Sequence, residues 1–472
     1  MIEHDSHFID GVWTTSRGPG LIEVVNPATE QVVGHVPAGG AADVDAAVAA
    51  ARAALPAWRA LPAGERAAAL RRIAAGVRAR QDEIVDSIVV ELGTPRSQAV
   101  AMQAGIVAHT FEDTADALER RPEVERIGNS EVRWEPVGVV GAITPWNFTL
   151  YQLALKVAPA LGVGCTVVAK PSEVVGLTPY LLGEIVADAR LPNGVLNLVW
   201  GDGPVVGEAI ASHPGIDAVS FTGSNRAGRR VAELASATVK PVSLELGGKS
   251  PSVVLDDADL AAAVPAGVAN CFANNGQVCA ALTRMIVPRD RLAEVERLAA
   301  EAAAAYVPGD PNAEGARLGP VVSAVQRDRV LGYLRAGVEQ GARVLVGGPD
   351  GQDVPETGYY VAPTVFSDVD PQARIAQEEI FGPVLAIIPV DSEEEAVAVA
   401  NGTPFGLNAA VWSADAERAA RVASRVDAST VYINGASFNP SAPFGGTKQS
   451  GYGRERGAHG LDEFVRTKAY QV

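Results

Sequence analysis

Cysteine is scarce in this chain of 472 residues, which contains only Cys165, Cys271 and Cys279. Three cysteines without a paired spacing do not form a disulfide framework, so free thiols and a reducing compartment are expected. Long hydrophobic runs are also missing: no stretch reaches the roughly 18 apolar residues of a membrane span, and the N-terminus lacks a signal-peptide pattern. These absences predict a soluble, cytoplasmic protein with no membrane partner.

Positive charge and histidine are sparse as well. The 39 Lys and Arg residues face 56 Asp and Glu residues, which gives a formal net charge of -17. Such a surface repels phosphate backbones, so no nucleic-acid partner is expected. His4 and His7 form the one close histidine pair, in a segment that we expect to be a mobile, solvated tail, so no metal site is predicted.

Apolar sequence is abundant, with 47% hydrophobic and 20% charged residues. At this length the composition predicts a large core divided between two or more domains. The first 115 residues favour helices. Asp43 is suited to cap a helix whose apolar residues Val44, Val48 and Leu55 share a face. Gly93 is suited to end a later helix.

From residue 137 the pattern changes to short apolar runs separated by helical stretches. These runs cover 137–143, 166–169, 195–199, 218–221 and 241–244. The alternation predicts a doubly wound parallel sheet, which binds ligands at the carboxyl ends of its strands.

A second alternation, from about 250 to 435, predicts another α/β domain. Its strands are expected at 283–287, 343–346, 384–389 and 430–433, and one of its helices at 291–305. Two remaining segments, 123–135 and 463–472, read as extended strands outside either sheet. Because an isolated hairpin is unstable, these segments are expected to pair with something else, such as another subunit.

Cys279 is the cysteine that stands out chemically. It follows the polar sequence Asn-Asn-Gly-Gln, and loops carry reactive groups more often than cores do. Cys271 lies in an apolar stretch and Cys165 beside a core strand, so both fit the ordinary role of a small buried hydrophobe. A nucleophilic cysteine also needs a base or a positive field near it.

Two polar residues follow strands of the first sheet. Glu245 ends the fifth apolar run and precedes two glycines, which allow the backbone to pass close to a ligand. Asn147 follows the first run, where an amide can stabilise an oxyanion. Taken alone, Glu245 also fits a solvated carboxylate at a strand end, and Asn147 a turn residue.

Two glycine loops each follow a strand and open a helix. The segment 201–207 is similar to the dinucleotide fingerprint, with one residue too many before its last glycine, and 221–224 forms the other loop. Both offer free N–H groups to a phosphate, although ordinary turns between strand and helix have the same composition.

Seven motifs in a fixed order connect these candidates. They are Pro-Trp-Asn-Phe at 145–148, Ala-Lys-Pro-Ser-Glu at 169–173, Phe-Thr-Gly-Ser at 221–224, Leu-Glu-Leu-Gly-Gly-Lys at 244–249, Gly-Gln-Val-Cys at 276–279, Glu-Ile-Phe-Gly-Pro at 379–383 and Pro-Phe-Gly-Gly at 443–446. This set resembles the NAD(P)-dependent, non-acylating aldehyde dehydrogenase superfamily from Asn26 to the C-terminus. The pattern also resembles a bacterial subgroup that includes dehydrogenases for ω-oxo fatty acids.

The resemblance implies catalytic roles. Cys279 would attack the aldehyde, and Glu245 would activate the water that hydrolyses the thioester. Asn147 and the backbone N–H of Cys279 would form the oxyanion hole, and Lys156 would assist proton relay.

The resemblance also implies the binding residues. NAD is the expected cofactor, with NADP possible, because Glu173 repels a 2′-phosphate whereas Lys170 offsets that repulsion. The cofactor would contact Ile143, Thr144, Pro145, Trp146, Lys170, Ser172, Glu173, Gly203, Gly207, Phe221, Gly223, Ser224, Leu246, Gly247, Glu379 and Phe381. The aldehyde tunnel would be lined by Phe148, Tyr151, Gln152, Val278, Ala280 and Phe438, positions with no arginine to bind a carboxylate.

The predicted organisation has three parts. Residues 1–116 and 137–247 form the cofactor domain, 248–437 the catalytic domain, and 117–136 with 460–472 an arm that builds a homodimer or homotetramer. Two alternatives share the fold: a coenzyme-A-acylating dehydrogenase, which tends to lack the base, and a non-catalytic lens-type structural protein, which has no reason to keep Cys279, Glu245 and Asn147 together.

Overall fold

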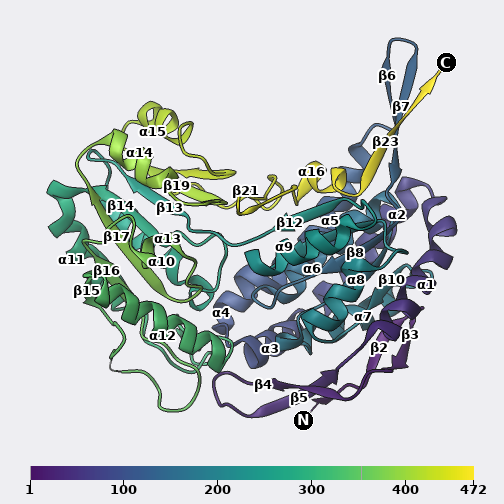
Figure 1. Ribbon diagram of the computed structural model, residues 1–472, viewed down its shortest axis with the longest axis horizontal. Helices are drawn as coiled ribbons and strands as arrows, with labels where there is room; N and C mark the ends of the chain where they lie inside the picture. Colours follow the sequence, from purple (N-terminus) through teal and green to yellow (C-terminus); the bar gives the residue numbers. More distant parts are fainter. Residues whose placement is uncertain (1, 352) are drawn as a thin grey trace.

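The computed structural model describes residues 2–351 and 353–472. Two twisted sheets, each covered by helices, lie at opposite ends of the molecule, and a narrow β arm projects from one side (Figure 1). The arrangement is an α/β fold, as the sequence predicts. Within the described chain, no helix combines the length and apolar character needed to cross a membrane.

The first sheet is the doubly wound one. Its strand order is β22-β12-β11-β8-β9-β10-β2-β3, where β22 covers Gly451–Tyr452, and the five central strands run parallel. Those strands are β8 (Val139–Ile143), β9 (Thr166–Lys170), β10 (Leu196–Leu198), β11 (Ala218–Thr222) and β12 (Val242–Glu245). All five predicted runs therefore form strands, and the switch point lies between β8 and β11.

Alternating side chains of this sheet enter two separate cores. Val139 and Ile143 of β8 pack toward α1 (Ala41–Arg59), whereas Val140 and Ala142 pack on the opposite face. The helices of that second core are α2 (Ala63–Ala79), α3 (Gln81–Leu92), α5 (Gly105–Arg120), α6 (Thr149–Val163) and α7 (Thr178–Asp188). Burial on both faces explains why these strands read as continuous apolar runs.

The second sheet has the order β15-β16-β17-β14-β13-β19-β20 and is parallel except for β15. Its strands are β15 (Arg343–Val346), β16 (Thr364–Ser367), β17 (Val384–Val390), β14 (Arg284–Pro288), β13 (Pro251–Val254), β19 (Asn408–Trp412) and β20 (Thr430–Ile433). Helices α10 (Leu260–Phe272), α11 (Leu292–Ala303), α12 (Ala324–Glu339), α14 (Glu393–Asn401) and α15 (Ala416–Ala423) cover it. Residues 246–250 join the carboxyl end of β12 to the start of β13, so the two sheets meet there.

The N-terminal segment corrects two expectations. Residues before 40 form strands rather than helices: β1 (Ile2–Glu3), β2 (Ser6–Ile9), β3 (Val12–Thr15), β4 (Leu21–Val25) and β5 (Val32–Pro37). The expected mobile tail is also wrong, because β2 extends the main sheet beyond β10. His7 is fully buried, and the backbone N–H of Trp200 donates to its Nδ1 at 3.2 Å.

Asp43 stabilises α1 from a different position than expected. The N-cap is Gly40, and Asp43 lies in the first turn, where its carboxylate accepts a hydrogen bond from the Gly40 N–H at 3.0 Å. This is the acidic half of a capping box. Gly93 ends α3 in the left-handed conformation, as predicted.

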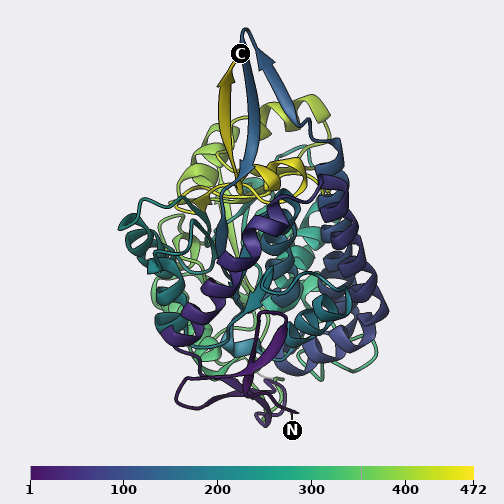
Figure 2. The ribbon, with the colours of Figure 1, turned by 90° about the vertical axis from the view of Figure 1, so that its right-hand side faces the viewer.

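The arm is a small antiparallel sheet of order β23-β7-β6. Strand β7 (Ser130–Pro136) pairs with β6 (Val124–Ile127) on one side and with the C-terminal strand β23 (Val465–Gln471) on the other. The arm projects away from the body with the C-terminus at its tip, opposite the N-terminus (Figure 2). Both segments are extended and lie outside the two main sheets, as the sequence predicts.

Candidate active site

The loop that carries Cys279 is held in an unusual backbone conformation. After α10 ends, Asn274, Asn275 and Gly276 have φ values of 49°, 60° and 73°, in the left-handed region where asparagine and glycine are favoured. A side chain on Gly276 would collide with the backbone of Gly382. The Asn-Asn-Gly sequence therefore supplies the residues that this turn requires.

Side-chain amides fix the same loop to its surroundings. Asn275 Nδ2 donates to the Gly93 and Pro320 carbonyls at 3.0 and 2.8 Å, and the Gly319 N–H donates to Asn275 Oδ1 at 2.7 Å. Asn274 Oδ1 accepts a hydrogen bond of 2.7 Å from the Thr94 hydroxyl. The loop is therefore rigid around its cysteine.

The three cysteines differ as expected from the sequence. Cys165 and Cys271 are fully buried, whereas Cys279 is partly exposed and lines a cavity. Burial, together with the nearby carboxylates of Glu379 and Glu245, raises the pKa of Cys279 to about 12, against the opposing charge of Arg456. The thiol is thus protonated at neutral pH until a base or a bound group changes its surroundings.

Asn147 lies directly against the cysteine loop. It is buried, its Nδ2 donates to the Gln277 carbonyl at 3.0 Å, and Asn274 Nδ2 donates to the Asn147 carbonyl at 2.9 Å. A primary amide carries two N–H donors, so one donor remains for a ligand. The structure brings Asn147 and Cys279 together, although they are distant in sequence.

Glu245 ends β12 as a buried carboxylate that accepts no hydrogen bond from a side chain of the described residues, with the Gly446 backbone N–H acting weakly on it. Burial and the neighbouring Glu455 raise the pKa of Glu245 well above its usual value, while Lys156 acts in the opposite direction. A Cβ atom on Gly445 would lie 2.7 Å from Glu245 Oε1, so glycine is required for this close approach. Glu245 has the environment of a tuned base.

Lys156 and Glu455 form a buried ion pair beside Glu245. Lys156 Nζ, on α6, lies 2.6 Å from Glu455 Oε1, and both side chains are excluded from solvent. Glu455 was not predicted from the sequence. Its backbone pairs with Phe444 through N–O distances of 2.7 and 2.9 Å, which returns the C-terminal segment across the site.

The predicted adenosine-side residues gather at the carboxyl ends of β9 and β10. Lys170 Nζ lies 2.7 Å from Glu173 Oε2, and the Ser172 hydroxyl caps the turn that begins at Glu173. Burial opposes ionisation of Glu173, but the charge of Lys170 and hydrogen bonds from Lys170 and the Gly203 backbone keep its pKa below the usual value. Gly207 adjoins the Lys170 side chain in the short helix Gly203–Gly207.

The loop after β8 contacts the Lys170 backbone, and the loop after β11 contacts the end of β12. The Thr144 N–H donates to the Lys170 carbonyl at 3.1 Å, while the buried Thr144 hydroxyl has no partner among the described residues. The Gly223 N–H donates to the Glu245 carbonyl at 3.0 Å, and Ser224 caps α9 (Asn225–Ser236). Ile143 and Phe221 are paired across the neighbouring strands.

The remaining predicted contacts lie where the two sheets meet. Glu379 Oε1 accepts a hydrogen bond from the Gly248 N–H at 3.0 Å, and a Cβ on Gly247 would lie 2.7 Å from Glu379 Oε2. Leu246 is buried beside them. Trp146, next to Pro145, packs edge to face on Phe381 with ring centroids 5.3 Å apart.

A cavity of about 530 Å³ leads to Cys279. All six predicted tunnel residues line it, and most of the remaining lining is apolar. The lining residues that were not predicted include Met102, Ile106, Trp412, Tyr432, Phe444 and Arg456.

Arg456 changes the expected character of this tunnel. No arginine occurs at the six predicted positions, but Arg456 lines the same cavity from the C-terminal segment. Its backbone has φ 76° and ψ 152°, close to a region that only glycine adopts readily, at a cost of roughly 1–3 kcal/mol. Arg456 could not be assigned from local pattern, because its place depends on the return of the C-terminal segment.

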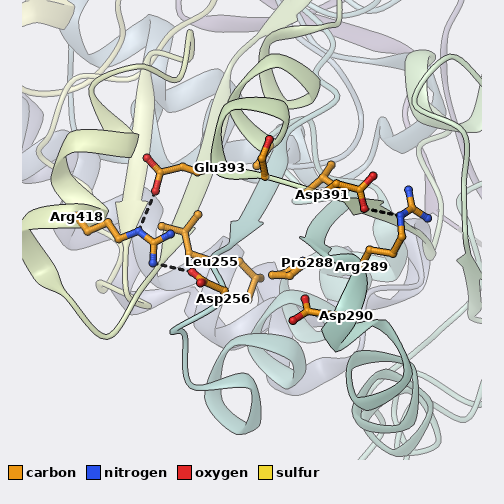
Figure 3. Close-up of a pocket in the computed structure, with 12 residues that line it drawn as sticks. Leu255, Asp256, Pro288, Arg289, Asp290, Asp391, Glu393 and Arg418 are labelled. Carbon is orange, nitrogen blue, oxygen red and sulfur yellow. Dashed lines mark hydrogen bonds and ion pairs between the residues drawn. The ribbon is translucent and has the colours of Figure 1, made fainter.

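Another cavity, of about 340 Å³, lies at the carboxyl ends of β13, β14 and β17 (Figure 3). Its arginines are paired with acids: Arg418 lies 2.6 Å from Asp256 and 2.8 Å from Glu393, and Arg289 lies 2.8 Å from Asp391. It has no cysteine or histidine in its lining. The chemistry is therefore concentrated at the first cavity.

Comparison with known proteins identifies the family. A sequence profile of the aldehyde dehydrogenase family matches residues 13–470. The chain belongs to the aldehyde dehydrogenase family. Its fold and its activity, NAD(P)-dependent oxidation of an aldehyde to a carboxylic acid through a cysteine thioester, follow from that membership.

Several aldehyde dehydrogenases are similar over nearly their whole length. A 3-succinoylsemialdehyde-pyridine dehydrogenase from a Pseudomonas species is 45% identical, with 99% of this chain and 98% of the relative covered. A mutant of aldehyde dehydrogenase C from Pseudomonas syringae, solved with NAD+ and octanal, has a TM-score of 0.98 at 50% identity, covering 99% and 96%. The Mycobacterium tuberculosis aldehyde dehydrogenase complexed with NAD+ has a TM-score of 0.97 at 42% identity, covering 100% and 98%.

Proposed function

We propose that this aldehyde dehydrogenase uses Cys279 as its nucleophile and Glu245 as the base for hydrolysis. The observation that carries the proposal is the position of Cys279. It is partly exposed at a largely apolar cavity, on a rigid loop that also contacts the Asn147 amide. Cys165 and Cys271 are buried away from this cavity and are unsuited to the role.

Acylation begins when the Cys279 sulfur attacks the aldehyde carbon and the carbonyl oxygen becomes an alkoxide. The free N–H of Asn147 and the backbone N–H of Cys279 stabilise that charge without reorganisation, because the loop is already fixed. The thiol proton needs an acceptor, since the pKa of Cys279 is high. Glu245, whose charge acts on this thiol, serves as that acceptor.

Hydrolysis of the thioester uses the same carboxylate, after it has released the thiol proton to solvent. Glu245 draws a proton from water as the water oxygen attacks the thioester carbonyl, and this proton returns to the Cys279 sulfur as the sulfur leaves. The Lys156–Glu455 pair sets the field around Glu245, because Glu455 raises its pKa and Lys156 lowers it. We assign Lys156 a positioning and proton-relay role through this pair.

The residues present fit a dinucleotide. The unpartnered Thr144 hydroxyl, the N-terminus of α9 and the close approach of Gly247 to Glu379 form a cradle in which larger side chains have no room. Lys170 and Glu173 would hold the adenosine ribose, Gly223 and Ser224 the pyrophosphate, and Glu379 the second ribose. When bound, NAD+ accepts the hydride that leaves the substrate carbon.

We propose a preference for NAD+ over NADP+. The Glu173 carboxylate stays ionised beside Lys170 and is therefore suited to accept hydrogen bonds from the hydroxyl groups of the adenosine ribose. The 2′-phosphate of NADP+ would be repelled by the Glu173 carboxylate. Lys170 already pairs with Glu173, so Lys170 offsets this repulsion only in part.

The assembly proposed is a homodimer or homotetramer built partly through the arm. The outer edges of β6 and β23 are unpaired within the described chain, and Ile127 and Val472 are exposed there. Sedimentation of the full chain at micromolar concentration tests this, and a monomer would contradict it. We place the reaction in the cytoplasm, because a reducing compartment keeps Cys279 as a free thiol.

The direct test of the nucleophile is Cys279→Ala with Cys271→Ala as its matched control. Cys279→Ala is expected to lower kcat by roughly a thousandfold or more while leaving NAD+ binding intact, because the thioester no longer forms. Cys271→Ala should retain turnover. NADH formation and calorimetric NAD+ binding are the measurements, and appreciable turnover by Cys279→Ala would overturn the assignment.

A further inference from the structure

Arg456 is a charged residue of the tunnel for which the proposed mechanism has no use. Its guanidinium carbon lies 4.4, 4.8 and 5.7 Å from the ring centroids of Phe444, Phe438 and Tyr151. None of the carboxylates in the described chain lies within ion-pair distance of Arg456, and its Nε is buried without a hydrogen-bond partner. The cation is thus held by aromatic faces and lacks an anion.

The charged groups of the two residues before Arg456 each have a polar partner in the protein. Arg454, two residues earlier, donates to the Gly446 and Gly453 carbonyls at 2.9 and 2.6 Å. The carboxylate of Glu455 pairs with Lys156 on the other side. The missing partner of Arg456 is therefore a feature of this residue and not of the whole segment.

Tyr151 supplies a second unpartnered donor in the same cavity. Its hydroxyl is buried and faces Arg456, which acts on it as a hydrogen-bond donor, and the Tyr151 O–H itself has no acceptor among the described residues. Stacking on a ring engages the flat face of a guanidinium and leaves the N–H groups at its edge available. Two polar donors with no anionic acceptor among the described residues thus lie together in a largely apolar tunnel, the usual form of a specificity contact.

We propose that Arg456, assisted by Tyr151, binds a carboxylate at the far end of the substrate and so selects aldehydes that carry an acidic group. This inference rests on the proposed function, because it requires the aldehyde end of the same molecule to reach Cys279. The hydrocarbon between the two ends contacts the apolar lining, which includes Phe148, Val278 and Trp412. A carboxylate suits the site because a charge-assisted hydrogen bond to Arg456 replaces the water that the anion loses.

Another role for Arg456 predicts a different result. Its positive charge also favours the thiolate of Cys279. If that were its function, removing the charge would slow every aldehyde alike. Binding of a terminal carboxylate affects only substrates that have one, so paired substrates separate the two roles.

The experiment compares straight-chain ω-oxo carboxylates with n-alkanals of the same carbon number, using the full chain and NAD+. The wild type should prefer the acidic aldehyde at one or more lengths. Arg456→Leu, which has the same backbone restriction as arginine, should lower that preference, the ratio of the two kcat/KM values, by about tenfold to a hundredfold. Tyr151→Phe should lower the ratio less, and Arg456→Lys should restore part of it.

Arg297→Leu is the matched control, because Arg297 is exposed on α11 and pairs with Glu301 outside the tunnel. It should leave the ratio unchanged. Equal losses for both substrate series in Arg456→Leu, or no preference in the wild type at any length, would overturn the proposal. If the wild type oxidised neither series, the proposed function itself would fail, which is a different result. Should Arg456→Leu not fold, Tyr151→Phe and Arg456→Lys decide the question by the same ratio.

Discussion

Each of the two sheets has charged side chains beyond the carboxyl ends of its parallel strands, and the two sets differ in their pairing. At the second sheet, Arg418 and Arg289 pair with the acids around them (Figure 3). At the first sheet, the buried Glu245 carboxylate has no ion-pair or side-chain hydrogen-bond partner among the described residues, and its pKa is raised by burial and by Glu455. The Glu245 carboxylate is therefore available for chemistry, whereas the paired charges of the second sheet hold the fold together.

The position of the active site follows from the same comparison. Residues 246–250 carry the chain from the carboxyl end of β12 to the start of β13, and Cys279 precedes the start of β14. The proposed catalytic groups Glu245 and Cys279 thus lie between the carboxyl edge of one sheet and the amino edge of the other. The carboxyl edge of the second sheet faces away and carries the paired charges.

Among the variants that test this comparison of the two sheets, the largest effect is expected from removing the positive charge of Lys156, which lowers the pKa of Glu245. Lys156 lowers the pKa of Glu245, so Lys156→Met raises that pKa further and leaves more of the base protonated at neutral pH. The rising limb of the kcat–pH profile should move to higher pH, with kcat near neutrality reduced by about tenfold or more.

Glu455→Gln is the counterpart with the opposite sign. Because Glu455 raises the pKa of Glu245, its neutralisation should move the same limb to lower pH. Lys156→Arg should hold the limb near its original place. If the limb shifted in the same direction in Lys156→Met and Glu455→Gln, the Lys156–Glu455 pair would not control the pKa of Glu245.

A smaller effect is expected at the cofactor ribose. Glu173→Ala removes the carboxylate that meets the 2′-position, so the ratio of kcat/KM for NAD+ to that for NADP+ should fall by about tenfold. The ratio is measured at saturating aldehyde. A wild-type value for NADP+ equal to or above that for NAD+ would show that Glu173 does not exclude the phosphate.

The smallest effect is expected at the second sheet. Arg418→Ala breaks its pairs with the exposed Asp256 and the partly exposed Glu393, so the free energy of unfolding should fall by about 1 kcal/mol at most. kcat/KM should not change. Urea unfolding measures the free energy of unfolding, and steady-state kinetics measure kcat/KM. A severalfold loss of kcat/KM would contradict the claim that the paired charges of the second sheet have no role in catalysis.

The sequence predicted the strands and the residues that follow them directly. Asn147 and Glu245 were located because each ends an apolar run, and Cys279 because a polar loop precedes it. These signals are local, and parallel strands bring their carboxyl ends to one edge.

Residues whose place depends on distant pairing could not be predicted. Glu455 and Arg456 reach the site only because the backbone of Glu455 pairs with Phe444 and returns the C-terminal segment. His7 looked solvated because its burial depends on β2 pairing with β10, far along the chain. Neither arrangement leaves a periodic trace in the sequence.

The most direct test of the central claim is a single-turnover experiment on Glu245→Gln. If Glu245 is the base that hydrolyses the thioester, this variant should still form its first equivalent of NADH, at a reduced rate. The later steady-state turnover should then be slow, because the thioester is no longer hydrolysed efficiently. Intact-mass measurement should find an acyl group on Cys279 that accumulates in the variant and not in the wild type. Turnover equal to that of the wild type, with no acyl-enzyme on Cys279, would contradict the account.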